Sequence, residues 1–510
     1  DRSASHGISL SEHDAGHILN PFLPRPQSSG EHVPSTYNPV RGVLLLVGSL
    51  LARFGLVERE RVRRATDLSW PRIVTGLARM SKSTVDVAMV GLALGPTAIA
   101  GVGFAAPFWE LVFALGGGVA GGTIGMVSQR YGANADEELA VTVTTSAAVV
   151  LGLTLPLTAA YWVVPGLLVD LVGTGSEAVG YGVQYLRVVA LGVPFAALNL
   201  IASRTLVGAD DAWTPMLLRA GGAVVNIALN AVFIFGFGLG VVGAALGTVI
   251  ANVLVTAGFT VGLARGGLPI IGAFPVQVPM SRPFLDRGLG RDLAKTGTPL
   301  VGANLARTGA QFPRLFIVGL FGPGVVSAYV VALRVRALLD TPNWGLSLAS
   351  SSLVGQALGD DDEAKATVWA QTVLRLSIGV YIVVAATLLP FSRGIARLFV
   401  SDPTVLPLVT VFVAVACASV VFRGVDGGST GPLRASGDTR WPFYSQLAGM
   451  YLFALPLAYL GYVTPLGEVA LYASLVVETA VPAAVTYYRF RSGTWRVVSR
   501  SYRPDAALDD

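Results

Sequence analysis

The chain has 510 residues, of which 53% are hydrophobic and only 13% are charged, and its mean hydropathy is +0.63. Soluble globular chains have about a quarter of their residues charged. The composition therefore argues against a soluble enzyme and, despite the net charge of +5, against a nucleic-acid-binding protein. It is typical of a protein that crosses a membrane several times.

All four histidines lie within the first 32 residues, so the apolar part of the chain has none. This excludes histidine proton relays and most zinc chemistry there. A membrane-embedded enzyme would need a cluster of catalytic groups, so we expect no enzyme, no catalytic residue and no cofactor. Cys417, the single cysteine, lies in an apolar run and is predicted to be a small buried residue.

Residues 1–67 are predicted to be a cytoplasmic tail. Residues 1 to about 40 are polar and rich in Pro and Ser, and we expect them to be disordered. The apolar segment 43–56 is too short to span a bilayer and precedes the basic run RERVRR. This pattern predicts a helix lying on the membrane surface.

Apolar stretches of about 20 residues, the length that crosses a bilayer, recur from Trp70 onward. They predict twelve membrane helices, at 70–93, 98–126, 138–164, 179–206, 214–236, 239–264, 293–321, 325–357, 364–389, 403–432, 441–462 and 467–488. The fold class expected is an all-α polytopic membrane protein with two lobes of six helices each. The lobes are residues 68–264 and 293–490, with a cytoplasmic connector at 265–292 and a cytoplasmic tail at 491–510.

The two predicted lobes resemble each other in sequence. Residues such as Pro71 and Arg79 recur 228 positions later, and Gln129 and Gly132 recur 227 positions later as Gln356 and Gly359. Each lobe has an even number of helices, so both enter the membrane in the same direction. The sequence thus predicts a parallel repeat with a cleft between the lobes.

Arg and Lys gather in alternate loops, such as 265–295 and 434–440, and in the C-terminal tail, whereas the opposite loops contain only Arg393 and Arg397. Basic residues mark the cytoplasmic side. We therefore expect both termini to be cytoplasmic, with the protein in the plasma membrane among lipids. We also expect a monomer without a nucleic-acid partner.

Three motifs carry a family resemblance: VDVAMVG at 85–91, GDTRWP at 437–442 with its counterpart ADDAWTP at 209–215, and NIALNAVFIFG at 226–236. Together they resemble the multidrug and toxic compound extrusion (MATE) family over about residues 68–490. The resemblance implies a cation-coupled antiporter, driven by H⁺ or Na⁺, that exports amphipathic and often cationic small molecules.

Ionisable residues at membrane depth are costly and usually functional. Lys82 and Asp86 are four residues apart and share one helical face, as do Asn226 and Asn230. The resemblance places Asp86, Asn226, Asn230 and Thr248 in the cation site of archaeal-type MATE proteins, with Asn199 as a looser match. Those proteins have Asp at the position of Asn230, which leaves Asp86 as the only acid of this set.

Each of these assignments has a structural alternative. Lys82 and Asp86 could form an ion pair that only stabilises the fold, and the Asn pair could only join helices. In the second lobe, Arg314 stands at the repeat position of Asp86, and Asp426 at that of Asn199. A contact between these two would be either a structural ion pair or part of the substrate site, and Arg423 is a competing partner for Asp426.

The predicted substrate cleft contains Lys82, Glu110, Arg314 and Asp426. Glu110 follows an aromatic cluster and is a candidate contact for a cationic substrate, unless it lies at the membrane interface. Glu478 has no assigned role. The nearest rival function is a flippase for lipid-linked or polysaccharide substrates, which would need a more cationic cleft, and Arg314, Arg334 and Arg336 keep this alternative open.

Overall fold

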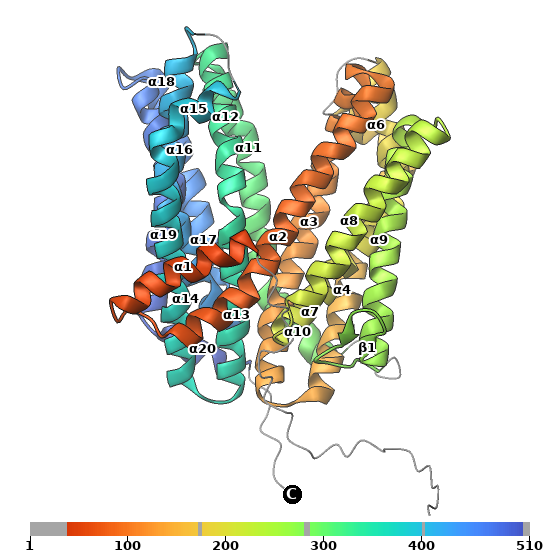
Figure 1. Ribbon diagram of the computed structural model, residues 1–510. Coiled ribbons are helices and arrows are strands. Elements are labelled where there is room, and N and C mark those ends of the chain that lie inside the picture. The colour runs from red at the N-terminus through yellow and green to blue at the C-terminus, as the bar shows by residue number, and fades with distance from the viewer. Residues whose placement is uncertain (1–37, 172–175, 280–285, 400–402, 503–510) are drawn as a thin grey trace, which may run out of the picture. The chain divides into compact units, whose positions relative to one another are not determined.

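The computed structural model describes residues 38–171, 176–279, 286–399 and 403–502. The helices of the N-terminal half, most of which are labelled in Figure 1, are α1 (Pro39–Arg53), α2 (Arg59–Leu94), α3 (Pro96–Gly132), α4 (Asp136–Val163), α5 (Pro165–Asp170), α6 (Ser176–Val189), α7 (Val193–Gly208), α8 (Trp213–Ala231) and α9 (Gly240–Arg265). A 3₁₀ turn, η1 (Ala190–Gly192), joins α6 to α7, and a wider π turn, η2 (Val232–Gly236), follows α8.

The remaining helices belong to the C-terminal half. Its helices are α10 (Arg287–Gly309), α11 (Gln311–Gly319), α12 (Pro323–Leu339), α13 (Thr341–Gly359), α14 (Glu363–Leu388), α15 (Ser392–Arg397), α16 (Leu406–Ala435), α17 (Arg440–Leu447), α18 (Leu455–Val463), α19 (Glu468–Arg491) and α20 (Thr494–Ser499). A 3₁₀ turn, η3 (Leu389–Phe391), follows α14, and a π segment, η4 (Ala448–Ala454), lies between α17 and α18.

Each of the twelve predicted membrane spans coincides with a helix or a run of helical segments. Several spans are interrupted, and proline explains two of the breaks. Pro194 lies in the first turn of α7 and Pro342 in the first turn of α13. Proline has no N–H to donate and fits the first turn of a helix, so a new helix starts at each position.

The fold differs from the prediction at three segments. The helix that contains the first predicted span, α2, begins at Arg59 and so includes the basic run before the span. The connector 265–292 contains a small antiparallel hairpin, β1 (Gly267–Leu268) and β2 (Gly272–Ala273), which was not predicted. The tail 491–510 contains α20, where Trp495 stacks on Phe490.

The short helix before the first span is confirmed as α1. Asn38 caps it, because its side-chain oxygen accepts hydrogen bonds from the N–H groups of Val40 and Arg41 at 2.9 and 3.4 Å. The disorder expected for residues 1–37 concerns positions outside the described residues. Cys417 is fully buried in a C-half core with Tyr329 and Phe412, as expected.

Nine of the described helical stretches are long and apolar enough to cross a membrane by length and composition. The other three predicted spans are α2, α10 with α11, and α12 with α13. They contain ionisable residues such as Lys82, Asp86, Arg307 and Asp340. Intramembrane charges of this kind usually face a cavity or another charge and not lipid.

The two halves meet along α3, which packs against α10 and α13. Near the ends of α3 and α13 the contact is very close. A Cβ atom added to Gly132 would overlap the backbone oxygen of Gln356, and one added to Gly359 would overlap that of Gln129. Only glycine allows the two helices to cross at this distance. We call this crossing, Ser128–Gly132 with Ser352–Gly359, the inter-lobe seal.

Candidate functional site

A cleft of about 860 Å³ is lined by residues of both halves. In the N-terminal half, α2, α3, α7, α8 and α9 contribute, and in the C-terminal half, α10, α13 and α16 are the main contributors. Of the predicted substrate residues, Lys82, Glu110 and Asp426 line it, whereas Arg314 does not. The volume is within the usual range for small-molecule sites.

Asp86 on α2 lies at one wall of the cleft and has two close partners. The Lys82 ammonium, one helical turn earlier, lies 2.8 Å from its Oδ2 atom, which confirms the ion pair of the sequence analysis. The Asn230 side-chain amide donates to Oδ1 at 2.8 Å. The carboxylate is thus bonded through both oxygens and keeps 17% of its side-chain surface exposed.

Asn230 links Asp86 to a chain of polar groups on α8 and α9. Its Nδ2 atom also lies 3.4 Å from Asn226 Oδ1, and Asn226 in turn donates to Thr248 Oγ1 at 3.1 Å. Both asparagines are fully buried. A Cβ at Gly247 would overlap Asn230 Oδ1, so glycine is needed for α8 and α9 to pack at this point. The structure therefore brings Asp86, Asn226, Asn230 and Thr248 together.

These atoms form an oxygen-rich site beside a single carboxylate. The Oδ1 atom of Asn230 is buried and has no hydrogen-bond partner among the described residues. Amide, hydroxyl and carboxylate oxygens are the ligands that hard cations prefer. The site can therefore accept either a proton on Asp86 or a small cation among the oxygens of Asp86, Asn226, Asn230 and Thr248.

Asn199 belongs to a neighbouring network and does not touch Asp86. Its amide donates to the side chain of Asn252 at 3.2 Å, and Thr256 donates to its Oδ1 at 2.9 Å. Asn252 connects the two networks, because its amide donates to the Thr248 carbonyl at 2.8 Å. Asn252 and Thr256 were not predicted, although Thr248, Asn252 and Thr256 follow each other at intervals of four in the sequence.

Tyr185 on α6 is a further member that the sequence analysis missed. Its hydroxyl hydrogen-bonds with Thr248, and it lies close enough to Asp86 for an electrostatic interaction. Tyr185 also lines the cleft. A lone tyrosine in an apolar helix gives no sequence signal, so only the packing of α6 against α9 reveals it.

Arg314 and Asp426 do not form the contact that the sequence left open. Arg314 pairs with Glu478 on α19, at 2.9 Å, and Arg336 binds the same carboxylate oxygen at 2.9 Å. Asp426 instead accepts hydrogen bonds from Thr430 and Thr486 at 3.3 and 3.2 Å. Glu478 is buried, and a buried acid is more stable between two cations than one would be, so Arg314 points away from the cleft.

Arg423 is the nearest basic group to Asp426, at 3.6 Å, but it binds Asp340 more closely. Its Nε and Nη2 atoms contact the two carboxylate oxygens of Asp340 at 2.8 and 2.6 Å. This two-bond geometry is the strongest form of an arginine–carboxylate pair. Arg314, Arg336 and Arg423 thus lie beside Glu478, Asp340 and Asp426, a group of three arginines with three acids.

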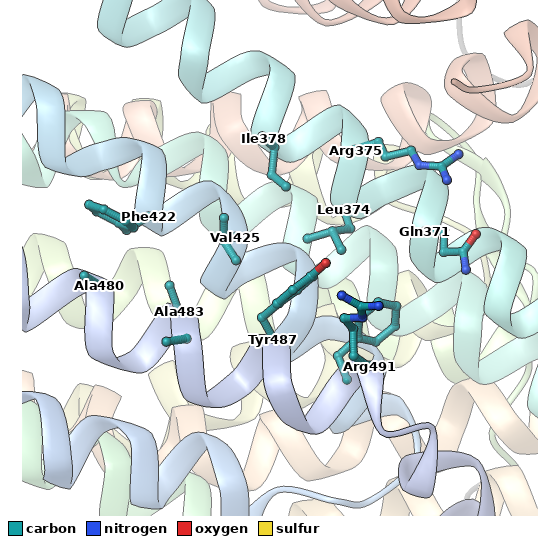
Figure 2. Close-up of a pocket in the computed structure, with 12 residues that line it drawn as sticks. Gln371, Leu374, Arg375, Ile378, Phe422, Val425, Ala480, Ala483, Tyr487 and Arg491 are labelled. Carbon is teal, nitrogen blue, oxygen red and sulfur yellow. The ribbon is translucent and has the colours of Figure 1, made fainter. Parts of the chain in front are cut away.

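A second groove, of about 510 Å³, lies between α14, α16 and α19. Figure 2 shows Gln371, Arg375 and Arg491 at one end of it and Phe422 and Ala480 at the other. No predicted site residue lines this groove. We therefore place the candidate functional site in the larger cleft.

Residues 71–232 and 299–460 both match the MatE family model, one copy in each half. The matched segments cover well over half of the chain, so the protein belongs to the MatE family of membrane transporters. This confirms the resemblance and the two-lobe, all-helical membrane fold. The tandem match also agrees with the sequence repeat.

Two relatives that match this chain over most of their length are named as multidrug resistance proteins. The chain is 28% identical to a protein of Bradyrhizobium diazoefficiens named "Probable multidrug resistance protein NorM", over 84% of this chain and 93% of that one. It is 26% identical to the multidrug resistance protein PmpM of Pseudomonas aeruginosa, over 88% and 95% of the two chains.

Solved structures share the fold. A crystal structure of MATE in the straight conformation superposes with a TM-score of 0.78 at 21% identity and covers 91% of this chain and 100% of its own. A transporter of the MOP superfamily from Pyrococcus furiosus, described as having reversed polarity of its binding pocket, superposes with a TM-score of 0.77 at 21% identity, covering 91% and 99% of the two chains.

Proposed function

We propose that this protein is a cation-coupled efflux transporter that moves small molecules out of the cell by alternating access. As a transporter it makes and breaks no covalent bond. The observation that carries the proposal is the Asp86 carboxylate, which faces the cleft with buried Asn226 and Asn230 behind it. The multidrug resistance names of the relatives support efflux as the direction of transport.

Coupling starts at the ion pair of Lys82 and Asp86. An incoming H⁺ or Na⁺ competes with the Lys82 ammonium for the carboxylate, so its binding breaks a contact within α2. The same event changes the charge that α2 presents to the cleft and to the Asn230 amide. We propose that α2 then packs differently, and that this change favours the conformation with the opposite opening.

The inter-lobe seal takes part in the second half of the proposed transport cycle. α3 and α13 cross closely at Gly132 and Gly359, and we propose that this crossing closes one end of the cleft. We infer that this end lies on the cytoplasmic side, because basic residues favour that side. We propose a protein of the plasma membrane with both termini in the cytoplasm, in which the seal opens to admit the substrate and closes for its release.

The three arginines on which the flippase alternative rested in the sequence do not line the cleft, although other arginines make the cleft cationic. The alternative depended on Arg314, Arg334 and Arg336 as a cationic site for a diphosphate. Arg314 and Arg336 both bind Glu478, so their charges are compensated and lie outside the cleft lining.

The test is transport by purified protein in liposomes, with a pH gradient or a sodium gradient imposed separately. Wild type should export a fluorescent substrate under one of the two gradients. Asp86→Asn should fold and bind the substrate but lose gradient-driven transport. The matched control is Asp292→Asn, since Asp292 lies on α10 outside the cleft lining and pairs with Lys295. Wild-type rates in Asp86→Asn would overturn the coupling role of Asp86.

A further inference from the structure

The cleft has an excess of positive charge. Its lining contains six basic side chains and three acidic ones, namely Arg79, Lys82, Arg204, Arg219, Arg307 and Arg434 against Asp86, Glu110 and Asp426. Lys82 and Asp86 neutralise each other. The remaining lining still has more arginines than acids, which runs against the cationic substrates that the family resemblance implied.

Three of these arginines come from three helices and meet on one face of α13. Arg79 of α2 and Arg204 of α7 lie 5.7 and 5.1 Å from the centre of the Trp344 ring. Arg434 of α16 lies 3.4 Å from the hydroxyl of Ser347, one turn further along α13. Arg219 of α8 is close enough to Arg79 for their charges to repel. We call Arg79, Arg204, Arg219 and Arg434 the arginine cluster.

No member of the arginine cluster forms a salt bridge with an acid among the described residues. Arg204 is 3% exposed, and its Nη1 atom has no hydrogen-bond partner there. The Arg219 Nη1 and Arg434 Nε atoms are also buried and have no hydrogen-bond partner among the described residues. Buried guanidinium groups with unused donors are unfavourable unless an anion reaches them. Glu110 acts electrostatically on Arg79 and Asp426 on Arg434, but these are two acids against four bases.

The C-terminal half shows the contrast within the same chain. Its buried arginines Arg314, Arg336 and Arg423 each bind a carboxylate within 3 Å. These three arginines are thus paired with acids, whereas Arg72, which is buried outside the cleft, has Ser203 as its hydrogen-bond partner. The arginine cluster is unpaired and faces the cleft.

We infer that the arginine cluster binds an anionic group of the transported compound, so the substrates include amphipathic organic anions. The inference rests on the proposed function and names its substrate class. Arginine binds carboxylates, sulfonates and phosphates through two parallel hydrogen bonds. Trp109, Phe113 and Trp344 also line the cleft and offer aromatic surface for the apolar body of the compound.

The test compares two dyes that share a xanthene ring but differ in charge, carboxyfluorescein as the anion and rhodamine 123 as the cation. Binding to the purified wild type is measured by fluorescence polarisation. Carboxyfluorescein should bind more tightly than rhodamine 123. Arg79→Gln and Arg204→Gln should each weaken its binding by roughly ten- to a hundredfold, the range for a hydrogen bond to a charged group. Arg397→Gln, at an exposed position outside the cleft, should leave it unchanged.

Arg204 is buried, so Arg204→Gln could fail to fold. Arg79 is exposed in the cleft, and Arg79→Lys retains the charge without the two-bond geometry. The inference is supported without Arg204→Gln if two results are found. Arg79→Lys should bind carboxyfluorescein with an affinity between those of wild type and Arg79→Gln, and wild type should lose affinity for this dye at high salt. Preferred binding of rhodamine 123, unaffected by the arginine substitutions, overturns it.

A lipid phosphate has the same chemistry, so a third arm measures flipping of fluorescent phosphatidylglycerol in the same liposomes. Flipping of this lipid without transport of carboxyfluorescein would overturn the soluble-anion inference in favour of a lipid substrate. Export of rhodamine 123 but not of carboxyfluorescein would overturn the substrate class and leave the proposed efflux function standing. Transport of neither dye and of no lipid under either gradient would instead contradict the proposed function itself.

Discussion

Gln129 on α3 and Gln356 on α13 make the same hydrogen bond in opposite directions across the seal. The Gln129 amide donates to the carbonyl of Ala435 at the end of α16, and the Gln356 amide donates to that of Gly208 at the end of α7, at 3.2 Å. Both the donors and the acceptors are separated by 227 residues in the sequence. The repeat thus holds the two lobes together by a pair of equivalent contacts.

Gly132→Ala should weaken the seal. The added methyl would overlap the Gln356 backbone oxygen, so α3 and α13 must separate. Overpacking of this kind costs about 1–3 kcal/mol, which shifts a two-state equilibrium by roughly five- to 150-fold. We expect a smaller fraction of molecules closed at this end and slower transport.

The measurement is maleimide labelling from the cytoplasmic side of Thr308→Cys, a cleft position, on a Cys417→Ala background. Labelling should be faster in Gly132→Ala than in the parent. Gly103→Ala is the matched control on the same helix, because a Cβ at Gly103 meets no atom within 4 Å. Equal rates in all three proteins would show that the glycine crossing does not control access.

Asn230→Asp should increase the preference for sodium. The new carboxylate would lie next to Asp86, with the present side chains 2.8 Å apart. Two carboxylates at this distance cannot both stay ionised without a cation, and a second acid strengthens a site of hard oxygen ligands. We expect the melting temperature of Asn230→Asp to rise with NaCl, because a ligand that binds only the folded state stabilises it.

The same titration with choline chloride separates sodium binding from ionic strength. Asn252→Asp is the comparison variant, because Asn252 contacts Asn199 and Thr248 and not Asp86. A NaCl response of Asn230→Asp no larger than that of wild type would show that residue 230 does not determine ion choice.

Arg314 and Glu478 should be energetically coupled, whereas Arg314 and Asp426 should not. Removing one partner of a buried pair costs about 3–5 kcal/mol, because the other charge is left uncompensated. Glu478→Gln leaves both Arg314 and Arg336 without their acid, so it should destabilise the protein more than Arg314→Gln does.

The measurement is a double-mutant cycle on thermal unfolding in detergent. Arg314→Gln with Glu478→Gln should destabilise less than the sum of the single changes. Arg314→Gln with Asp426→Asn should be close to additive, as is usual for residues without direct contact. Coupling confined to the second pair would contradict the observed network.

Asp210 makes the stability of the protein depend on pH. It lies in the loop between α7 and α8, where burial raises its pKa although the Arg64 guanidinium, 2.9 Å away, acts in the opposite direction. An acid with a higher pKa in the folded state binds its proton more tightly there. Its contribution to stability is therefore greatest at low pH and falls as pH rises through the raised pKa.

Wild type should accordingly lose stability relative to Asp210→Asn as pH rises from about 4 towards neutrality. The melting temperatures of the two proteins are measured across that range in one buffer series. Their difference shows whether wild type loses or gains stability as pH rises. Asp438, whose pKa is also raised by burial beside Arg489, should show the same sign in Asp438→Asn. A difference that moves in favour of wild type as pH rises would contradict the assignment.

The sequence predicted the membrane spans well because each is a run of apolar residues with a fixed minimum length. The family resemblance also grouped Asp86, Asn226 and Asn230, and the structure brings these side chains together. The spacing of four explains why the two asparagines share a helical face. The start of α2 was not predicted, since apolar length marks only the part of a helix that crosses the bilayer and not its charged extension.

The partners between helices were harder to predict. Arg314 and Asp426 were paired by their repeat positions, but Glu478 on α19 is the acid that Arg314 reaches. Asn199 was assigned to the site of Asp86, yet it faces Asn252 and Thr256. Which side chains meet depends on the rotation of each helix about its axis, and apolar periodicity leaves that rotation loosely defined when most faces are apolar.

In the cation coupling that we propose for Asp86, the Lys82–Asp86 contact also limits how long the cation stays bound. The ammonium is tethered one helical turn from the carboxylate, so it is present at a high effective concentration and at all times. Any external cation must displace it, and it returns as soon as that cation dissociates. The tether lowers the affinity for the driving ion but speeds its departure, and a carrier that must release its ion on every cycle benefits from fast exchange more than from tight binding.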